Sequence, residues 1–104
     1  MVDTYKAPLE DMRFVLHELL DLDRLTEIEA FEATTPDLID QILEEAAKFA
    51  EEVVAPLNQV GDQQGVRLEN GMVRMPDGFV ECYQKYVDAG WAAVCGDTNY
   101  GGQG

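Results

Sequence analysis

The stretch TTPDLIDQILEEAAKFAEEVVAPL, residues 34–57, is the most clearly specified element of the sequence. It predicts a long amphipathic helix with a favourable start. Thr35 can cap the first turn, Pro36 suits the first helical position, and Asp37 complements the positive end of the helix dipole. Because proline disfavours helical backbone at the residue before it, we expect the helix to end or kink just before Pro56.

The two faces of this helix differ in polarity. Apolar residues recur at helical spacing and form one stripe, which consists of Ile39, Ile42, Leu43, Ala46, Phe49, Ala50, Val53 and Leu57. The opposite face carries Asp37, Asp40, Glu44, Lys48 and Glu51. We interpret these acids as a solvated surface rather than as paired catalytic carboxylates. We also expect Glu44 and Lys48 to form an ion pair one turn apart.

Residues 7–22, APLEDMRFVLHELLDL, predict a first helix with Pro8 in its opening turn. The single histidine, His17, lies beside the apolar stripe of this helix rather than in a polar cluster. We therefore interpret it as a surface or partly packed side chain, not as a metal ligand or catalytic base.

Residues 21–32, DLDRLTEIEAFE, place acids at several positions of a calcium-binding loop. However, Leu25 and Thr26 occupy the positions where such a loop needs an oxygen ligand and a glycine turn. We therefore favour a short helix with Leu25, Ile28 and Phe31 directed inward.

After the polar stretch 58–65, the segment VRLENGMVRMP, residues 66–76, predicts a β-hairpin. Asn70 and Gly71 are typical of a type I′ turn, which needs positive φ at both central residues. The resulting register pairs Leu68 with Val73, Val66 with Met75, and Arg67 with Arg74. Because an isolated two-stranded ribbon is marginally stable in water, we expect this one to lie against helices.

Residues 77–91, DGFVECYQKYVDAGW, predict a last helix, capped by Asp77 and stopped by a left-handed Gly90. The side chains expected to point inward are Phe79, Cys82, Tyr83 and Tyr86. The remaining residues are predicted to be a loop. The predicted fold class is thus mainly α: a small domain of about four helices with one short β-hairpin.

The composition excludes several classes of function. The chain has 104 residues, 46% of them apolar, with 21 acids against seven Lys and Arg and a formal charge of −14. Such a charge repels phosphate backbones and anionic lipid, so we expect no nucleic-acid or membrane-surface partner. No apolar run could span a bilayer, and the first residues do not form a signal peptide, so a cytoplasmic location is expected.

The inventory of reactive side chains predicts no catalytic, cofactor-binding or metal site. One histidine and two cysteines cannot supply a structural zinc centre, and Cys82 and Cys95 are expected to be buried thiols rather than a disulfide. Serine is absent from the chain, which leaves only a pairing of His17 with either cysteine open as a nucleophile–base pair. The GGQG sequence lacks the spacing of a dinucleotide-binding fingerprint.

Four motifs in order resemble the N-terminal helical domain of the acyl-CoA dehydrogenases: EEVVAPLN at 51–58, MPDGF at 75–79, DAGW at 88–91 and NYGGQG at 99–104. The opening YKAPLEDMRFVLHELL, together with the hairpin, is similar to a bacterial subgroup of that family that includes enzymes acting on methylmercaptopropionyl-CoA. The resemblance implies an N-terminal extension at 1–34 and a truncated helical domain at 35–104.

Membership of this family implies a much larger parent protein, with a middle β-domain and a C-terminal helical bundle. It implies that the parent binds FAD and acyl-CoA, transfers a hydride to the flavin and passes electrons to an electron-transfer flavoprotein. The catalytic glutamate would lie in the C-terminal bundle, outside these residues. We therefore expect the isolated chain to bind no FAD and to be inactive, and the parent to be a homo-oligomer.

Tyr100, Gly101 and Gly102 match the YGG loop of the family, which implies a position near the acyl substrate. For these three residues we favour a tight turn that leads into a following helix over direct contact with a ligand. An alternative for the whole chain is a stand-alone acidic helical adaptor that binds a basic protein partner. A reading frame that continues past Gly104 favours the enzyme, and a stop codon there favours the adaptor.

Overall fold

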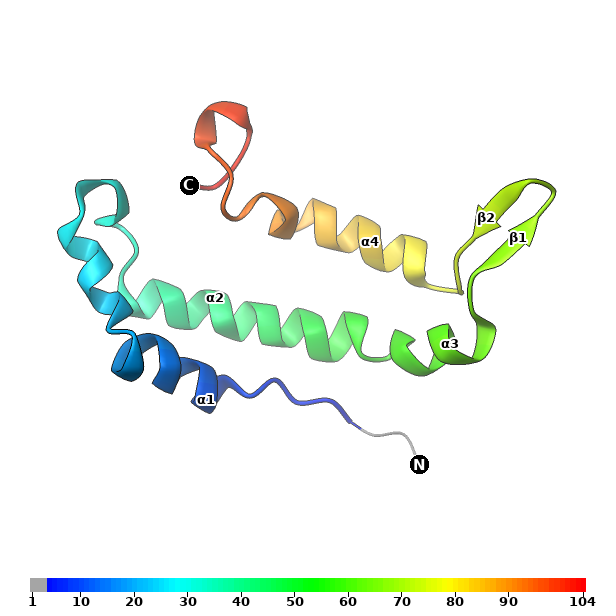
Figure 1. The fold of residues 1–104 in the computed structure, drawn as a ribbon, viewed down its shortest axis with the longest axis horizontal. Helices are drawn as coiled ribbons and strands as arrows, with labels where there is room; N and C mark the ends of the chain where they lie inside the picture. Colours follow the sequence, from blue (N-terminus) through cyan, green and yellow to red (C-terminus); the bar gives the residue numbers. More distant parts are fainter. Residues whose placement is uncertain (1–3) are drawn as a thin grey trace. The chain divides into compact units, whose positions relative to one another are not determined.

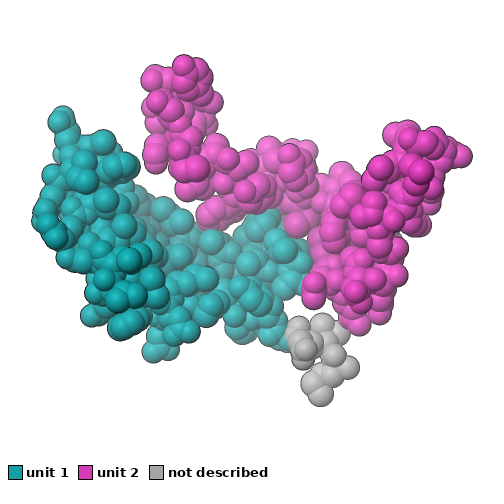
Figure 2. Space-filling model, in the orientation of Figure 1, with its two compact units in different colours: residues 1–55 teal, residues 56–104 magenta. Residues whose placement is uncertain are grey.

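The computed structural model describes residues 4–104 and divides into two compact units, residues 1–55 and residues 56–104 (Figure 2). Unit 1 contains the helices α1, Leu9–Arg13, and α2, Pro36–Phe49. Unit 2 contains α3, Leu57–Gln64, the strands β1, Arg67–Glu69, and β2, Met72–Arg74, and the helix α4, Phe79–Asp88 (Figure 1). The predicted fold class, mainly helical with one small hairpin, is confirmed. Residues 1–3 of the predicted extension lie outside the described part.

The start of α2 forms as its sequence predicts. The Thr35 hydroxyl accepts a hydrogen bond from the Leu38 amide at 3.2 Å, and Pro36 is the first helical residue. After Phe49 the helix widens into a π-helical turn at Ala50–Val54, closed by a bond from the Ala55 amide to the Ala50 carbonyl at 2.8 Å. The prediction that the α-helix ends or kinks before Pro56 is confirmed. It does so by changing from α-helical to π-helical hydrogen bonding ahead of the proline.

The first predicted helix also forms, in two parts. The helix α1 continues directly into a π-helical turn at Phe14–Leu19, in which the Leu20 amide donates to the Val15 carbonyl at 2.9 Å. Asp21, with φ 51°, ends this segment in the left-handed conformation. Pro8 takes the capping position just before the first turn.

The segment after Asp21 forms short 3₁₀ turns at Leu22–Glu27 and Glu29–Phe31. Leu25 is half-buried, but Ile28 and Phe31 are 50% and 44% exposed, so the prediction that all three point inward is wrong. The reason is local: Ile28 has an extended backbone, which separates the two turns and removes their common face.

The core of unit 1 is small and lies along α2. Ile39 and Ala47 are its buried apolar side chains, and the remainder of the predicted stripe is half-buried apart from Ile42, which is 39% exposed. A core of this size stabilises a fold only modestly, because hydrophobic stabilisation scales with the apolar area removed from water.

Unit 2 begins with a helix that the sequence did not predict. Residues 58–65 were expected to be a polar connection, but α3 forms there directly after Pro56. Proline restarts a helix easily because its missing amide is not needed in the first turn. The Phe79 ring lies against Gly61, and the Leu57 side chain lies against Gly78, so α3 packs on the start of α4.

The hairpin has the predicted turn and register. Asn70 and Gly71 have φ values of 52° and 76°, as a type I′ turn requires, and Leu68 pairs with Val73. These two apolar side chains are 75% and 67% exposed, however, so the expectation that helices cover the hairpin is wrong for the described residues. The turn and ladder are local interactions and form without that cover.

The helix α4 ends as predicted, with a left-handed Gly90 at φ 82°. Its predicted cap is wrong. Gly78, with φ 85°, precedes the first turn, and Asp77 instead forms a two-bond bracket with Gln64, accepting from its Nε2 at 3.1 Å and donating its amide to Oε1 at 2.9 Å. The left-handed backbone at Gly78 displaces Asp77 from the capping position.

Several side chains of unit 2 are more exposed than their sequence positions predict. On α4, Phe79 and Cys82 are half-buried, whereas Tyr83 is 66% exposed and its inward prediction is wrong. Cys82 and Cys95 are both free thiols, and Cys95 is exposed rather than buried because it lies in the loop after α4. Within residues 4–104, no helix is long and apolar enough to cross a membrane.

Candidate functional site

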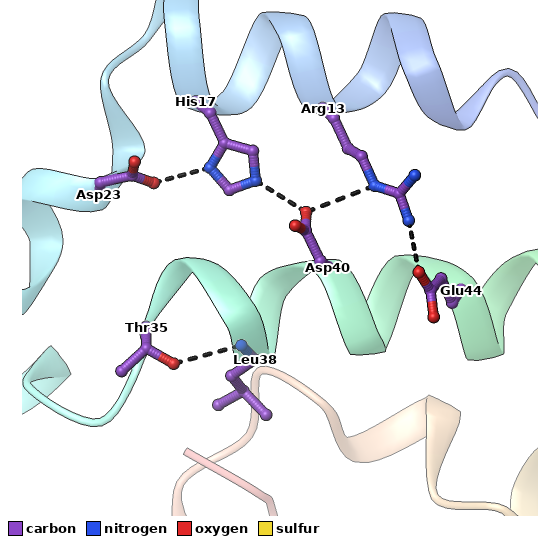
Figure 3. A network of polar contacts seen from close by, with 7 residues as sticks. All are labelled: Arg13, His17, Asp23, Thr35, Leu38, Asp40 and Glu44. Carbon is purple, nitrogen blue, oxygen red and sulfur yellow. Dashed lines mark hydrogen bonds and ion pairs between the residues drawn. The ribbon is translucent and has the colours of Figure 1, made fainter.

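A network of charged side chains joins three segments of unit 1 (Figure 3). We define the charge network as Arg13, His17, Asp23, Asp40 and Glu44. Arg13 ends α1, His17 lies four residues later in the π-helical turn, and Asp40 and Glu44 lie four residues apart on α2. Residues four apart share one helix face, so the two pairs can meet between the segments.

The imidazole of His17 is held between two carboxylates. Its Nδ1 lies 2.7 Å from Asp23 Oδ1, and its Nε2 lies 2.8 Å from Asp40 Oδ1. The histidine side chain is only 18% exposed. The prediction that His17 is partly packed is confirmed, but the prediction that it lies outside a polar cluster is wrong. The sequence could not show this contact, because Asp40 lies on another helix, 23 residues further along the chain.

Arg13 completes the network. Its Nη2 donates to Glu44 Oε1 at 2.7 Å, and its Nε lies 3.5 Å from the Asp40 oxygen that also contacts His17. Asp40 therefore faces two basic side chains, Arg13 at the end of α1 and His17 in the π-helical turn that follows it. Asp40 and Glu51 are half-buried and engaged by other segments, Glu51 through the Ala7 amide at 2.9 Å, so the interpretation as a solvated face is wrong for these two. Glu44 is exposed, as that interpretation expects, and also pairs with Arg13.

The two carboxylates raise the pKa of His17 above its ordinary value of 6.5, with the hydrogen bond to Asp40 as the largest cause and that to Asp23 next. Both ring nitrogens face carboxylate oxygens, and only the imidazolium form has a proton on each. The arrangement therefore favours a charged histidine.

This geometry removes the nucleophile–base pairing that the sequence left open. A histidine that activates a thiol needs a free ring nitrogen directed at the sulfur. Both nitrogens of His17 are engaged by carboxylates. The network is suited to holding segments together.

The predicted ion pair between Glu44 and Lys48 is replaced by another. Lys48 Nζ lies 2.8 Å from Glu45 Oε1, and this hydrogen bond is the main cause that raises the pKa of Lys48. Glu44 is engaged by Arg13 instead. Spacing of about one helical turn did not show which of the two neighbouring acids would pair with Lys48.

The loop of unit 2 that contains the predicted substrate-proximal residues is internally bonded. Asp97 Oδ1 accepts from the Asn99 amide at 2.7 Å, and the Asp97 carbonyl accepts from the amides of Tyr100 and Gly102, both at 3.0 Å. The amides of Gln103 and Gly104 donate to the carbonyls of Ala93 and Gly96. The predicted open loop is therefore a folded element, with a 3₁₀ turn at Thr98–Tyr100.

Tyr100, Gly101 and Gly102 are consecutive in this element. Tyr100 is 91% exposed, and Gly101 has a φ of 86°. The Gly101 amide donates to the Thr98 carbonyl at 3.3 Å, so the amides of all three residues are used within the loop. Their proximity to a substrate stays a prediction.

The described residues offer little that could hold a cofactor or a metal. A shallow depression in unit 1 is lined by residues 20–22, 24, 25, 27 and 28, and it opens widely to solvent. Among residues 4–104, no group of three or more His, Cys, Asp and Glu side chains is arranged to hold a metal ion. The loop amides do not form a phosphate cradle, because they donate to the loop's own oxygens.

Comparison with known proteins adds a relative. No protein-family model matches the chain. The chain is similar to a 3-methylmercaptopropionyl-CoA dehydrogenase of Ruegeria pomeroyi, with 35% identity over 101 residues. The match takes in 97% of this chain but only 17% of the length of that protein. It confirms the family resemblance inferred from the motifs: nearly the whole chain corresponds to one part of an acyl-CoA dehydrogenase.

Proposed function

We propose that residues 35–104 are the N-terminal helical domain of an FAD-dependent acyl-CoA dehydrogenase, and that residues 1–34 are an extension of that domain. The observation that carries this proposal is the 35% identity to such a dehydrogenase over 97% of the chain. The parent protein is then an oxidoreductase that introduces an α,β double bond into an acyl-CoA thioester.

Within the parent, this domain walls off one side of the substrate and flavin cavity. Excluding water there strengthens the electrostatic interactions that stabilise charge on the thioester carbonyl and the flavin. The exposed ring of Tyr100 and the tight turn at Gly101 and Gly102 supply a rigid, projecting edge for such a wall.

The residues of this chain do not by themselves fit FAD. The glycine loop uses its amides internally, and the depression at residues 20–28 is shallow and mainly apolar in its side chains. A dinucleotide needs a cradle for its pyrophosphate and a slot for its rings. FAD would therefore be held by the remainder of the parent, and the isolated chain is inactive.

The same proposal sets the partners and the location. The remainder of the parent chain covers apolar faces that this domain exposes, and the parent acts in the cytoplasm as a homo-oligomer. Its electrons then pass to an electron-transfer flavoprotein.

The test compares two purified proteins: the chain of residues 1–104 and the product of the complete reading frame that contains it. We expect the complete product to carry visible flavin absorbance that bleaches when 3-methylmercaptopropionyl-CoA or another acyl-CoA is added. The 104-residue chain should show neither signal after incubation with FAD. Stoichiometric FAD on the short chain would contradict the proposal that the FAD site lies in the remainder of the parent, and a complete product without flavin would contradict the proposed dehydrogenase.

The rival hypothesis is an acidic helical adaptor for a basic partner, and the formal charge of −14 is the observation that favours it. The reading frame separates the two proposals. A frame that continues for several times the length of this chain supports the dehydrogenase, whereas a stop codon directly after Gly104 supports the adaptor.

A further inference from the structure

Residues 6–19, which we call the first segment of unit 1, are held on α2 and the π-helical turn after it by three pairs of basic and acidic side chains. We call these three pairs the ladder, and each pair a rung. Lys6 Nζ lies 3.8 Å from Glu51 Oε2, Arg13 Nη2 lies 2.7 Å from Glu44 Oε1, and His17 Nε2 lies 2.8 Å from Asp40 Oδ1. Each step forward in the first segment matches an equal step backward along α2 and its π turn. Seven residues separate the first two rungs, and four separate the second from the third. The segment and α2 therefore run antiparallel.

The rungs differ in how well they are shielded from water. Lys6 is 76% exposed, so its pair with Glu51 contributes little. Glu51 also accepts from the Ala7 amide at 2.9 Å, and the His17 side chain is 18% exposed. The ladder is thus firmest at the histidine and at the Ala7 bond.

Apolar packing holds the same segment less completely. Phe14 and Leu19 are 59% and 68% exposed, and Val15 and Met12 are also exposed. Leu9 and Leu16 are half-buried, which leaves them as the apolar anchors of the segment. Because so much of its apolar surface remains in water, the attachment depends strongly on the charged rungs.

His17 is the rung whose charge changes near neutral pH. The groups that face it are Asp23 from the 3₁₀ turn, Asp40 from α2, and, beside the same Asp40 oxygen, Arg13 from α1. Loss of one imidazole proton leaves a nitrogen lone pair facing a carboxylate oxygen. One of the two hydrogen bonds is then replaced by repulsion.

We propose that residues 6–19 are a pH-gated strap, which the ladder holds against α2 when His17 is doubly protonated and which loosens when His17 loses a proton. The proposal does not rest on the dehydrogenase assignment, because each contact that it uses lies within unit 1.

The direction of the pH effect follows from the raised pKa of His17 in the folded chain. A group whose pKa is higher in the attached state stabilises that state fully below its value in the detached state, which is about 6.5. This stabilisation is lost as the pH rises through the raised value. The strap is therefore closed below about pH 6.5 and loosens as the pH rises through the raised pKa of His17.

The chain contains a single histidine, so its ring signals in a proton–nitrogen NMR titration are assigned without ambiguity. We expect His17 to titrate above 6.5. We also expect hydrogen exchange in residues 7–19, corrected for intrinsic rates, to accelerate at least about threefold between about pH 6 and pH 8.5. Titration at or below 6.5, or corrected exchange independent of pH, would overturn the proposal.

Two variants and a matched control separate gating from a general loss of folding. In Asp40→Asn, the His17 pKa should fall toward 6.5 and the pH dependence of exchange in the strap should shrink. In His17→Gln, that pH dependence should disappear. Asp37→Asn removes an exposed carboxylate from the same helix and should leave both readouts unchanged. Equal effects of Asp37→Asn and Asp40→Asn on the His17 pKa would contradict the ladder.

Discussion

Gly102 lies directly against the backbone of Gly96, and this contact sets the shape of the last residues of the chain. A Cβ atom at Gly102 would overlap the Gly96 carbonyl group. The close approach allows the Gly104 amide to donate to the Gly96 carbonyl at 2.9 Å. The glycine is therefore required here by space rather than by a positive φ.

The substitution Gly102→Ala is expected to open this loop. The added methyl group must displace backbone, which costs about 1–3 kcal/mol and corresponds to hydrogen exchange at Gln103 and Gly104 that is faster by a factor of roughly 5 to 160. The measurement is amide exchange by NMR. Asn99→Ala is the control, because the Asn99 backbone amide, not its side chain, bonds to Asp97. Unchanged exchange in Gly102→Ala would show that the loop does not depend on the contact.

At the scale of elements, the two ends of α2 are controlled by different means. The start depends on a local cap, in which the Thr35 hydroxyl satisfies an amide of the first turn. The end depends on Pro56, because its ring is incompatible with a regular α-helical backbone at the preceding turn. A π-helical turn at Ala50–Val54 comes directly before this end. Both causes lie within a few residues of the feature, which is why both were predictable.

Thr35→Ala should destabilise unit 1 by about 1 kcal/mol, because the amide of Leu38 loses its hydrogen-bond acceptor. Equilibrium unfolding in urea, followed by far-ultraviolet circular dichroism, measures the change. Thr34→Ala alters the neighbouring threonine, which is not the cap, and should have a smaller effect. A result in which the two variants are equally stable would argue against the cap.

At the scale of the whole molecule, little apolar surface is removed from water within the described chain. Ile39, Ala47 and Pro76 are the apolar side chains that are buried in the described residues, while Leu68, Val73 and Val80 are each at least two-thirds exposed. Exposed apolar patches of this kind mark surfaces that associate with other chains. The formal charge of −14 opposes association between copies at low salt.

We therefore expect the isolated chain to bind a hydrophobic dye and to self-associate increasingly as salt is added, since salt screens the repulsion between acidic surfaces. Sedimentation at low and high salt, across a range of protein concentrations, gives the measurement. A double variant, Leu68→Thr with Val73→Thr, removes apolar surface from the hairpin without touching the core and should reduce the effect. A chain that stays monomeric and binds no dye would contradict this expectation.

The amino-acid sequence by itself determined the features that depend on neighbours along the chain. These include the cap and the break of α2, the type I′ turn at Asn70 and Gly71, and the left-handed stop at Gly90. Each is a backbone preference of one or two residue types and is satisfied within a single turn. The ordered motifs also predicted the resemblance to the acyl-CoA dehydrogenases, and the 35% identity to the dehydrogenase of Ruegeria pomeroyi agrees with it.

Only the tertiary structure decided which charges meet. His17, Asp23 and Asp40 come from three segments, and their hydrogen bonds depend on how α1 and its π turn lie on α2. Sequence spacing placed Asp40 and Glu44 on a polar face but could not show that Arg13 and His17 from another segment pair with them. The same holds for the bracket between Gln64 and Asp77. A long-range polar pair forms only when the fold brings both side chains together. Helical periodicity in the sequence shows only the face of its own helix on which each residue lies.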